Sequence, residues 1–111
     1  MPDVPSVAVF DVPADLADTV LLDVREDDEW EKGHVDGALH IRLGDLMARA
    51  EEVPMDTEVV VTCRGGGRSA RAVAWLNENG YDTVNLTGGM GAWLEAGRPL
   101  VDGSGGPGTV R

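Results

Sequence analysis

The segment best suited to chemistry is a run of seven residues around the only cysteine of the chain. It reads Cys63-Arg64-Gly65-Gly66-Gly67-Arg68-Ser69. Glycines permit positive φ angles and close main-chain approach, so successive N–H groups can turn toward one anion. Such amides, together with Arg64 and Arg68, would stabilise a thiolate and lower the pKa of Cys63. The run therefore predicts a nucleophilic cysteine that needs no adjacent general base.

Strong secondary-structure patterns flank this run on both sides. Val59–Cys63 is apolar and rich in β-branched residues, which is typical of a buried strand. Ser69–Asn79 has apolar residues three and four positions apart and is followed by Gly80, which predicts a helix. In an open α/β sheet, ligands bind where the carboxyl end of a strand meets the amino end of a helix. The cysteine is therefore expected at the binding edge of a sheet.

Short strand and helix patterns alternate along the rest of the chain. Strands are expected at Val20–Val24, Ala38–Ile41 and Val84–Leu86, and helices at Glu26–Lys32, Asp45–Glu52 and Gly91–Ala96. The second of these helices should turn Leu46, Met47 and Ala50 inward. This alternation predicts an α/β fold with a mainly parallel central sheet of about five strands and helices on both faces.

Chain length and glycine content set the expected domain limits. A chain of 111 residues buries enough surface for one core and not for two. Residues 1–101 are expected to form this single domain. Residues 102–111 contain four glycines and a proline, which predicts a flexible Gly-rich C-terminal tail.

Composition narrows the class of protein further. Nine Lys and Arg residues against 20 Asp and Glu give a formal net charge of −11, which disfavours nucleic acid and membranes as partners. One cysteine forms no internal disulfide, and with His34 and His40 it does not complete the usual four-ligand zinc site, so neither a metal nor a cofactor is expected. The absence of a secretion signal and of a membrane-spanning apolar run predicts a cytoplasmic location.

Four segments of the chain follow one another in a recognisable order. They are Asp23-Val24-Arg25-Glu26, then Glu29-Trp30 with Gly33-His34-Val35-Asp36-Gly37-Ala38, the loop Cys63 to Ser69, and Gly88-Gly89-Met90-Gly91-Ala92-Trp93. Together they resemble the rhodanese-like domain family over Leu21 to Leu100. The resemblance implies a single-domain sulfurtransferase in which Cys63 takes the outer sulfur of thiosulfate or of a persulfide donor and holds it as a persulfide. The sulfur then passes to a thiophilic acceptor, which is cyanide, a small thiol or a protein thiol.

The resemblance also implies roles for individual residues. Cys63 is the catalytic residue, and the donor is bound by the remainder of the loop, which comprises Arg64, Gly65, Gly66, Gly67, Arg68 and Ser69. Arg25 either pairs internally with a carboxylate, which is the preferred interpretation, or helps to bind the donor. His34 is interpreted as a hydrogen-bonded turn residue, with proton transfer as the alternative. Many relatives have larger side chains at Gly66 and Gly67, so a more flexible loop and modest thiosulfate turnover are expected here.

Other interpretations of the same residues remain open. Cys63 alone is also compatible with a small buried hydrophobe at the end of a strand. A rhodanese module can carry sulfur or bind a protein without turning over small donors. A phosphatase or arsenate-reductase-like enzyme is less favoured, because Arg68 follows the cysteine by five positions. Similar phosphatases place this arginine one position farther along, which gives a loop wide enough for phosphate.

Overall fold

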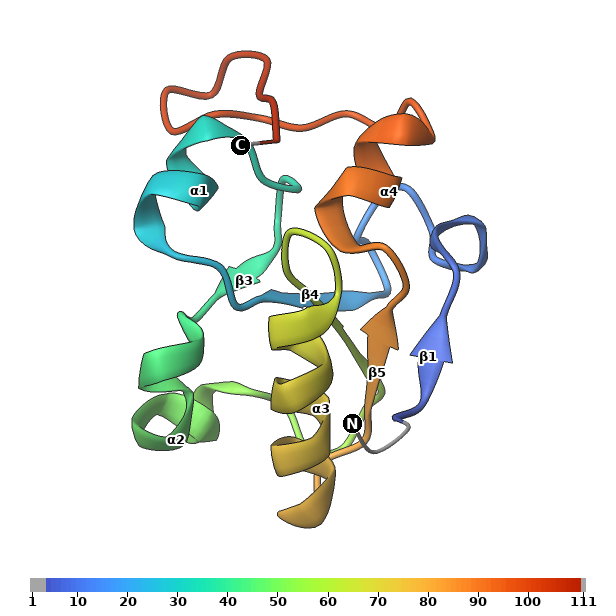
Figure 1. Ribbon diagram of the computed structural model, residues 1–111, viewed down its shortest axis with the longest axis vertical. Coiled ribbons are helices and arrows are strands. Elements are labelled where there is room, and N and C mark those ends of the chain that lie inside the picture. Colours follow the sequence, from blue (N-terminus) through green and yellow to red (C-terminus); the bar gives the residue numbers. More distant parts are fainter. Residues whose placement is uncertain (1–3, 111) are drawn as a thin grey trace.

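A five-stranded parallel sheet forms the centre of the structure, which is a computed structural model that describes residues 4–110 (Figure 1). Residues 1–3 of the expected domain and Arg111 of the expected tail lie outside the described residues. The strands lie in the order β1-β5-β4-β2-β3, and every neighbouring pair is parallel. Their bounds are β1 Ser6–Val7, β2 Val20–Asp23, β3 Leu39–His40, β4 Val59–Thr62 and β5 Thr83–Leu86. The predicted fold class is confirmed.

Within residues 4–110, three helices and three short 3-10 turns connect these strands, and a fourth helix follows the last strand. The helices are α1 Asp27–Lys32, α2 Leu46–Arg49, α3 Gly67–Glu78 and α4 Gly89–Glu95, and the turns are η1 Val9–Asp11, η2 Leu43–Asp45 and η3 Ala50–Glu52. The helix expected over Asp45–Glu52 is thus a single α-helical turn between two 3-10 turns. Its Met47, expected on the inner face, is 73% exposed. Within residues 4–110, no helix has the length and apolar character needed to cross a bilayer.

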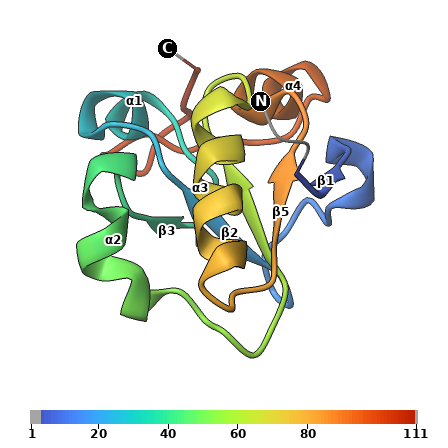
Figure 2. The ribbon, with the colours of Figure 1, turned by 60° about the horizontal axis from the view of Figure 1, so that its bottom comes forward.

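Alternating side chains of the central strands build two separate apolar layers. Val59 and Val61 pack on the face covered by α2 and α3, whereas Val60 packs with Trp93 of α4 on the opposite face. This division follows from the two-residue period of a strand, which directs successive side chains to opposite faces. Figure 2 shows α3 running across one face of the sheet. The parallel pairing of β2 with β4, in which Asp23 lies opposite Thr62, places the carboxyl ends of these two strands side by side.

The C-terminal segment, which is expected to be a flexible tail, makes main-chain contacts with the segment that follows α1. It runs from α4 back to α1 (Figure 1), and Val101 forms an antiparallel bridge with His34. The amide of Thr109 donates to the carbonyl oxygen of Lys32 at 2.9 Å. A Cβ at Gly33, which has an extended backbone (φ 173°), would overlap the main chain of Thr109. Main-chain hydrogen bonds and close glycine contacts hold the segment in place. Glycine content alone does not indicate such contacts.

Candidate active site

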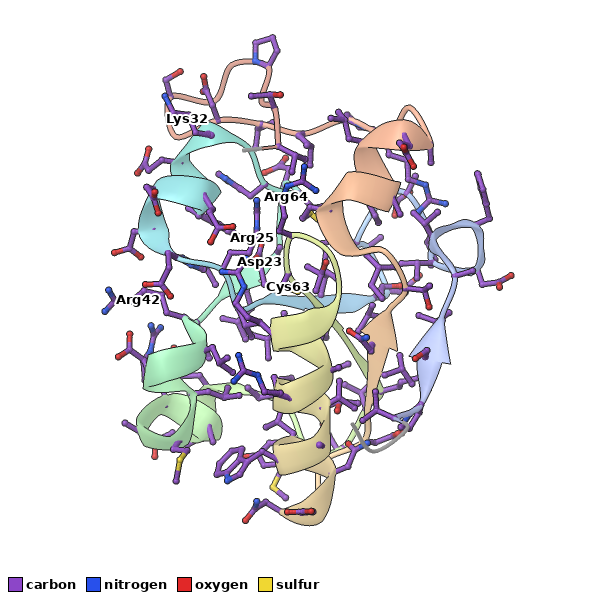
Figure 3. All side chains as sticks on the ribbon, in the orientation of Figure 1. Asp23, Arg25, Lys32, Arg42, Cys63 and Arg64 are labelled. Carbon is purple, nitrogen blue, oxygen red and sulfur yellow. The ribbon has the colours of Figure 1, made fainter. Side chains whose placement is uncertain are left out.

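Cys63 directly follows β4 and lies at the base of the loop that leads into α3. In Figure 1 this loop lies between α1 and α4, and Figure 3 shows Cys63 near Asp23, Arg25 and Arg64. The residue is 1% exposed. The amide of Gly66 donates to Sγ at 3.0 Å, and Oγ of Ser69 lies 3.3 Å from Sγ. The loop therefore surrounds the sulfur with hydrogen-bond donors.

These donors lower the pKa of the sulfur. Burial raises the pKa of the Cys63 thiol, but the hydroxyl of Ser69 and the amides of Ser69, Gly66 and Gly65 outweigh it. The pKa of Cys63 therefore lies below its ordinary value, so the thiolate forms more readily than in a free cysteine. Of the expected loop residues, Gly65, Gly66 and Ser69 are the ones that act directly on Sγ.

The three loop glycines differ in how strictly the backbone requires them. Gly66 has a φ of 111° and forms the amino-terminal cap of α3. This left-handed conformation, which side chains disfavour, turns its amide toward Sγ. Gly65 and Gly67 have no such φ, and a Cβ on either would meet no atom within 4 Å. Only Gly66 is therefore fixed as glycine by its conformation.

Arg68 is engaged by a residue that the sequence analysis did not connect with it. Its Nη1 and Nη2 donate to the two carboxylate oxygens of Glu29 in α1, at 2.7 and 2.9 Å. The hydrogen bond from Arg68 lowers the pKa of Glu29 to about 2. The charge of Arg68 is close enough to be stabilised by the Cys63 thiolate, although Glu29 contributes more. Arg68 was expected to bind the sulfur donor. Two of its N–H groups pair with Glu29 and so join α3 to α1.

The Glu29–Arg68 pair should make part of the stability depend on pH. Because the pKa of Glu29 falls from 4.5 to about 2 on folding, its contribution is complete above about pH 4.5 and is lost as the pH falls through 2. We expect Glu29→Gln to remove about 1 to 3 kcal/mol at pH 7 and much less at pH 2. Chemical denaturation across this range measures the difference. Exposed Glu51 supplies the control, Glu51→Gln, and equal pH profiles for the two variants would contradict the assignment.

Arg64 lies on the other side of the loop, against α4. It borders a cavity of about 380 Å³, and the other lining residues are Gly88, Gly91, Ala92, Leu94, Glu95 and Val110. A Cβ on Gly91 would lie 3.0 Å from Nη1 of Arg64, which shows how closely this side chain follows the helix. The residue is exposed. Arg64 therefore offers a solvent-accessible cation beside the cysteine loop.

Arg25 is buried and paired within the protein. Its guanidinium, 0% exposed, makes a bidentate contact with Asp23, with Nη2 at 2.8 Å from Oδ2. The same Nη2 donates to the carbonyl oxygen of Gly33 at 2.7 Å, which joins the end of β2 to the end of α1. Nδ1 of His34 donates to the carbonyl oxygen of Trp30 at 2.7 Å. Arg25 is thus paired with a carboxylate inside the protein, and His34 is hydrogen-bonded but lies in the bridge to Val101 rather than in a turn.

Asn85 is a polar contact of the loop that the sequence analysis missed. It lies in β5 with 8% exposure, and its Oδ1 accepts a hydrogen bond from the Ser69 hydroxyl at 2.5 Å. The available signal was a single amide side chain between the apolar residues Val84 and Leu86. Among residues 4–110, no three His, Cys, Asp or Glu side chains are grouped as a metal site requires.

The parallel sheet and the cysteine loop before α3 agree with comparisons to known proteins. The sequence profile of the rhodanese-like domain family matches residues 8–96. The chain therefore belongs to the rhodanese-like domain family.

Individual relatives support this assignment. The chain is 47% identical over 73 residues to the putative sulfurtransferase YtwF of Bacillus subtilis, covering 66% of this chain and 71% of that protein. It is 40% identical over 89 residues to a sulfurtransferase of Allochromatium vinosum, covering 79% and 83% respectively. A rhodanese-related protein from Thermoplasma volcanium superposes with a TM-score of 0.82 at 31% identity, covering 87% of this chain and 97% of that structure.

Proposed function

We propose that this protein is a sulfurtransferase that moves a sulfane sulfur from thiosulfate or a persulfide donor to a thiophilic acceptor. The moving sulfur is held as a persulfide on Cys63. The observation that carries the proposal is the set of donors around Sγ, with Gly66 N at 3.0 Å and Ser69 Oγ at 3.3 Å. A thiolate stabilised in this way is a ready nucleophile. The names of the two sulfurtransferase relatives support the same class of reaction.

The reaction proceeds in two displacements. In the first, an electron pair of the Cys63 thiolate forms a bond to the outer sulfur of thiosulfate. The sulfur–sulfur bond of thiosulfate breaks, and its electron pair leaves with sulfite. In the second, a cyanide ion or an acceptor thiolate attacks the outer sulfur of the persulfide, and the electron pair of that bond returns to Sγ as the thiolate. No redox partner and no net proton are required.

Two groups near the loop fit the charges of this reaction. The amides of Gly65 and Gly66 stabilise the negative charge on Sγ before the attack. Arg64, exposed beside the cavity at α4, supplies a cation for the sulfonate end of thiosulfate or for an anionic persulfide. Arg68 plays a lesser part because Glu29 occupies two of its donors.

The same pairing bears on the alternative functions. A phosphatase or arsenate reductase needs an arginine fork directed at the oxyanion, whereas the fork of Arg68 is directed at Glu29. This observation argues against that class, in agreement with the shorter loop. A carrier module that accepts sulfur without turning over small donors would form the same persulfide on Cys63. Only a measurement of turnover distinguishes such a module from an enzyme.

Turnover with thiosulfate and cyanide tests the proposal. We expect catalytic formation of sulfite and thiocyanate by the wild type and none by Cys63→Ser. Met47→Ser is the matched control, because it removes a sulfur atom from a side chain that is 73% exposed. Formation of a stable persulfide without thiocyanate turnover, using thiosulfate and a small-molecule persulfide in turn, would favour the carrier function. Hydrolysis of an aryl phosphate that depends on Cys63 would replace the proposal with the phosphatase class.

A further inference from the structure

The hydroxyl of Ser69 lies between two acceptors that compete for its one proton. Its Oγ is 3.3 Å from Sγ of Cys63 and 2.5 Å from Oδ1 of Asn85. All three residues are buried, with exposures of 1% for Cys63, 0% for Ser69 and 8% for Asn85. A serine hydroxyl donates one hydrogen bond and accepts others. The proton can therefore point to the sulfur or to the amide, but not to both.

The orientation of the Asn85 amide is fixed by a second contact. Its Nδ2 donates to the carbonyl oxygen of Gly66 at 3.2 Å, while the same carbonyl accepts from the amide of Ala70 at 3.1 Å. A flipped amide would bring Oδ1 against that carbonyl oxygen, which is unfavourable because both groups only accept hydrogen bonds. Oδ1 is thus held toward Ser69 as a permanent acceptor.

We propose that Asn85 is a positioning residue: its Oδ1 accepts the hydrogen bond of the Ser69 hydroxyl while the Cys63 sulfur is uncharged, and the hydroxyl turns to donate to the sulfur when the thiolate forms. In the thiol state, Cys63 S–H donates to Oγ and Oγ–H donates to Oδ1, so every group is satisfied. In the thiolate state, Oγ–H turns to Sγ and Oδ1 loses its donor. Asn85 therefore stabilises the uncharged sulfur relative to the thiolate.

This arrangement deepens the proposed sulfur transfer, on which its functional meaning rests. In the persulfide, Sγ is bonded to the outer sulfur, and the negative charge lies on that outer sulfur instead of on Sγ. The Ser69 hydroxyl can then donate to Oδ1 of Asn85 again, and this hydrogen bond favours the loaded state over the free thiolate. Asn85 thus stabilises the persulfide relative to the free thiolate without contacting the sulfur donor or the acceptor.

The pH dependence of Cys63 alkylation by iodoacetamide tests the inference without any sulfur donor. We expect Asn85→Val to lower the apparent pKa of Cys63 by about half to one unit. The variant removes the hydrogen bond from Ser69 to Asn85, which stabilises the thiol state and not the thiolate. Asn85→Asp should raise the apparent pKa, because a carboxylate beside Ser69 opposes the thiolate. Thr87→Val, an exposed change just after β5, is the control and should leave the profile unchanged.

The double variant Ser69→Ala/Asn85→Val shows whether Asn85 acts through the Ser69 hydroxyl or only supports the backbone of the loop at Gly66. If Asn85 acts through the Ser69 hydroxyl, Asn85→Val should produce no shift in the Ser69→Ala background. An equal shift in both backgrounds, or an increase in pKa on Asn85→Val alone, would overturn the inference and leave Asn85 as an anchor for Gly66. Should valine fail to pack in β5, Asn85→Ala gives the same comparison. Failure of sulfur transfer would not alter these profiles, so the two proposals are tested separately.

Discussion

Arg25→Met is expected to lower the free energy of unfolding by about 3 to 5 kcal/mol, because it leaves a buried carboxylate without its counter-charge. Asp23 is 1% exposed and receives its bidentate contact from Arg25. The substitution also removes the bond from Nη2 to the carbonyl oxygen of Gly33. Urea denaturation at neutral pH measures the loss.

Two further variants decide whether the Arg25 effect comes from the buried pair. The double variant Asp23→Asn/Arg25→Met removes both charges and should recover part of the lost stability. Arg49→Met breaks the Arg49–Glu52 pair, whose side chains are 42% and 40% exposed, and should cost at most about 1 kcal/mol. A fully stable Arg25→Met that instead shows a raised KM for thiosulfate would assign Arg25 to the donor site.

Gly89→Ala is expected to be the most damaging alanine substitution near the loop. Gly89 has a φ of 57°, and its Cβ would overlap the carbonyl oxygen of Cys63 and lie 2.8 Å from that of Arg64. The start of α4 meets the loop here, since the amides of Met90 and Gly91 donate to these two carbonyls at 2.8 and 3.1 Å. A side chain would push the helix and the loop apart. The pKa of Cys63 should rise as the loop amides move away from Sγ.

Gly97→Ala is the matched control for this effect. Gly97 has a similar positive φ of 75°, but a Cβ there would meet no atom within 4 Å. It should therefore lose only the backbone cost of about 1 to 2 kcal/mol, whereas Gly89→Ala adds the steric conflict and should lose about 3 kcal/mol or more. Thermal and urea denaturation of both variants give the comparison. Equal losses would show that the contact between α4 and the loop is unimportant.

The parts of the fold that the sequence predicted are those governed by local patterns. The β-branched run that became β4 and the apolar spacing of α3 placed Cys63 at the junction where the structure has it. Regular patterns of this kind depend on side chains a few positions apart. The two-residue strand β1 was missed, because so short a segment has no measurable period. The helix around α2 was predicted as continuous, whereas the structure has one α-helical turn between two 3-10 turns.

The parts of the site that were missed depend on residues far apart in the chain. Glu29 is 39 positions from Arg68, and Asn85 is 16 positions from Ser69. Nothing in the spacing of these residues indicates the pairing; only the fold brings them together. The contacts of the C-terminal segment were missed for another reason. Its glycines read as a source of flexibility, whereas in the structure they let the main chain approach Gly33 closely.

The intact mass of the protein after exposure to thiosulfate tests the central claim, that Cys63 holds the transferred sulfur. After removal of excess donor, the wild type should be heavier by one sulfur atom, and cyanide should return it to its original mass. Cys63→Ser should show no such increase, whereas Met47→Ser should behave as the wild type. The account is contradicted if no adduct forms with thiosulfate or with a small-molecule persulfide, or if the adduct persists in Cys63→Ser.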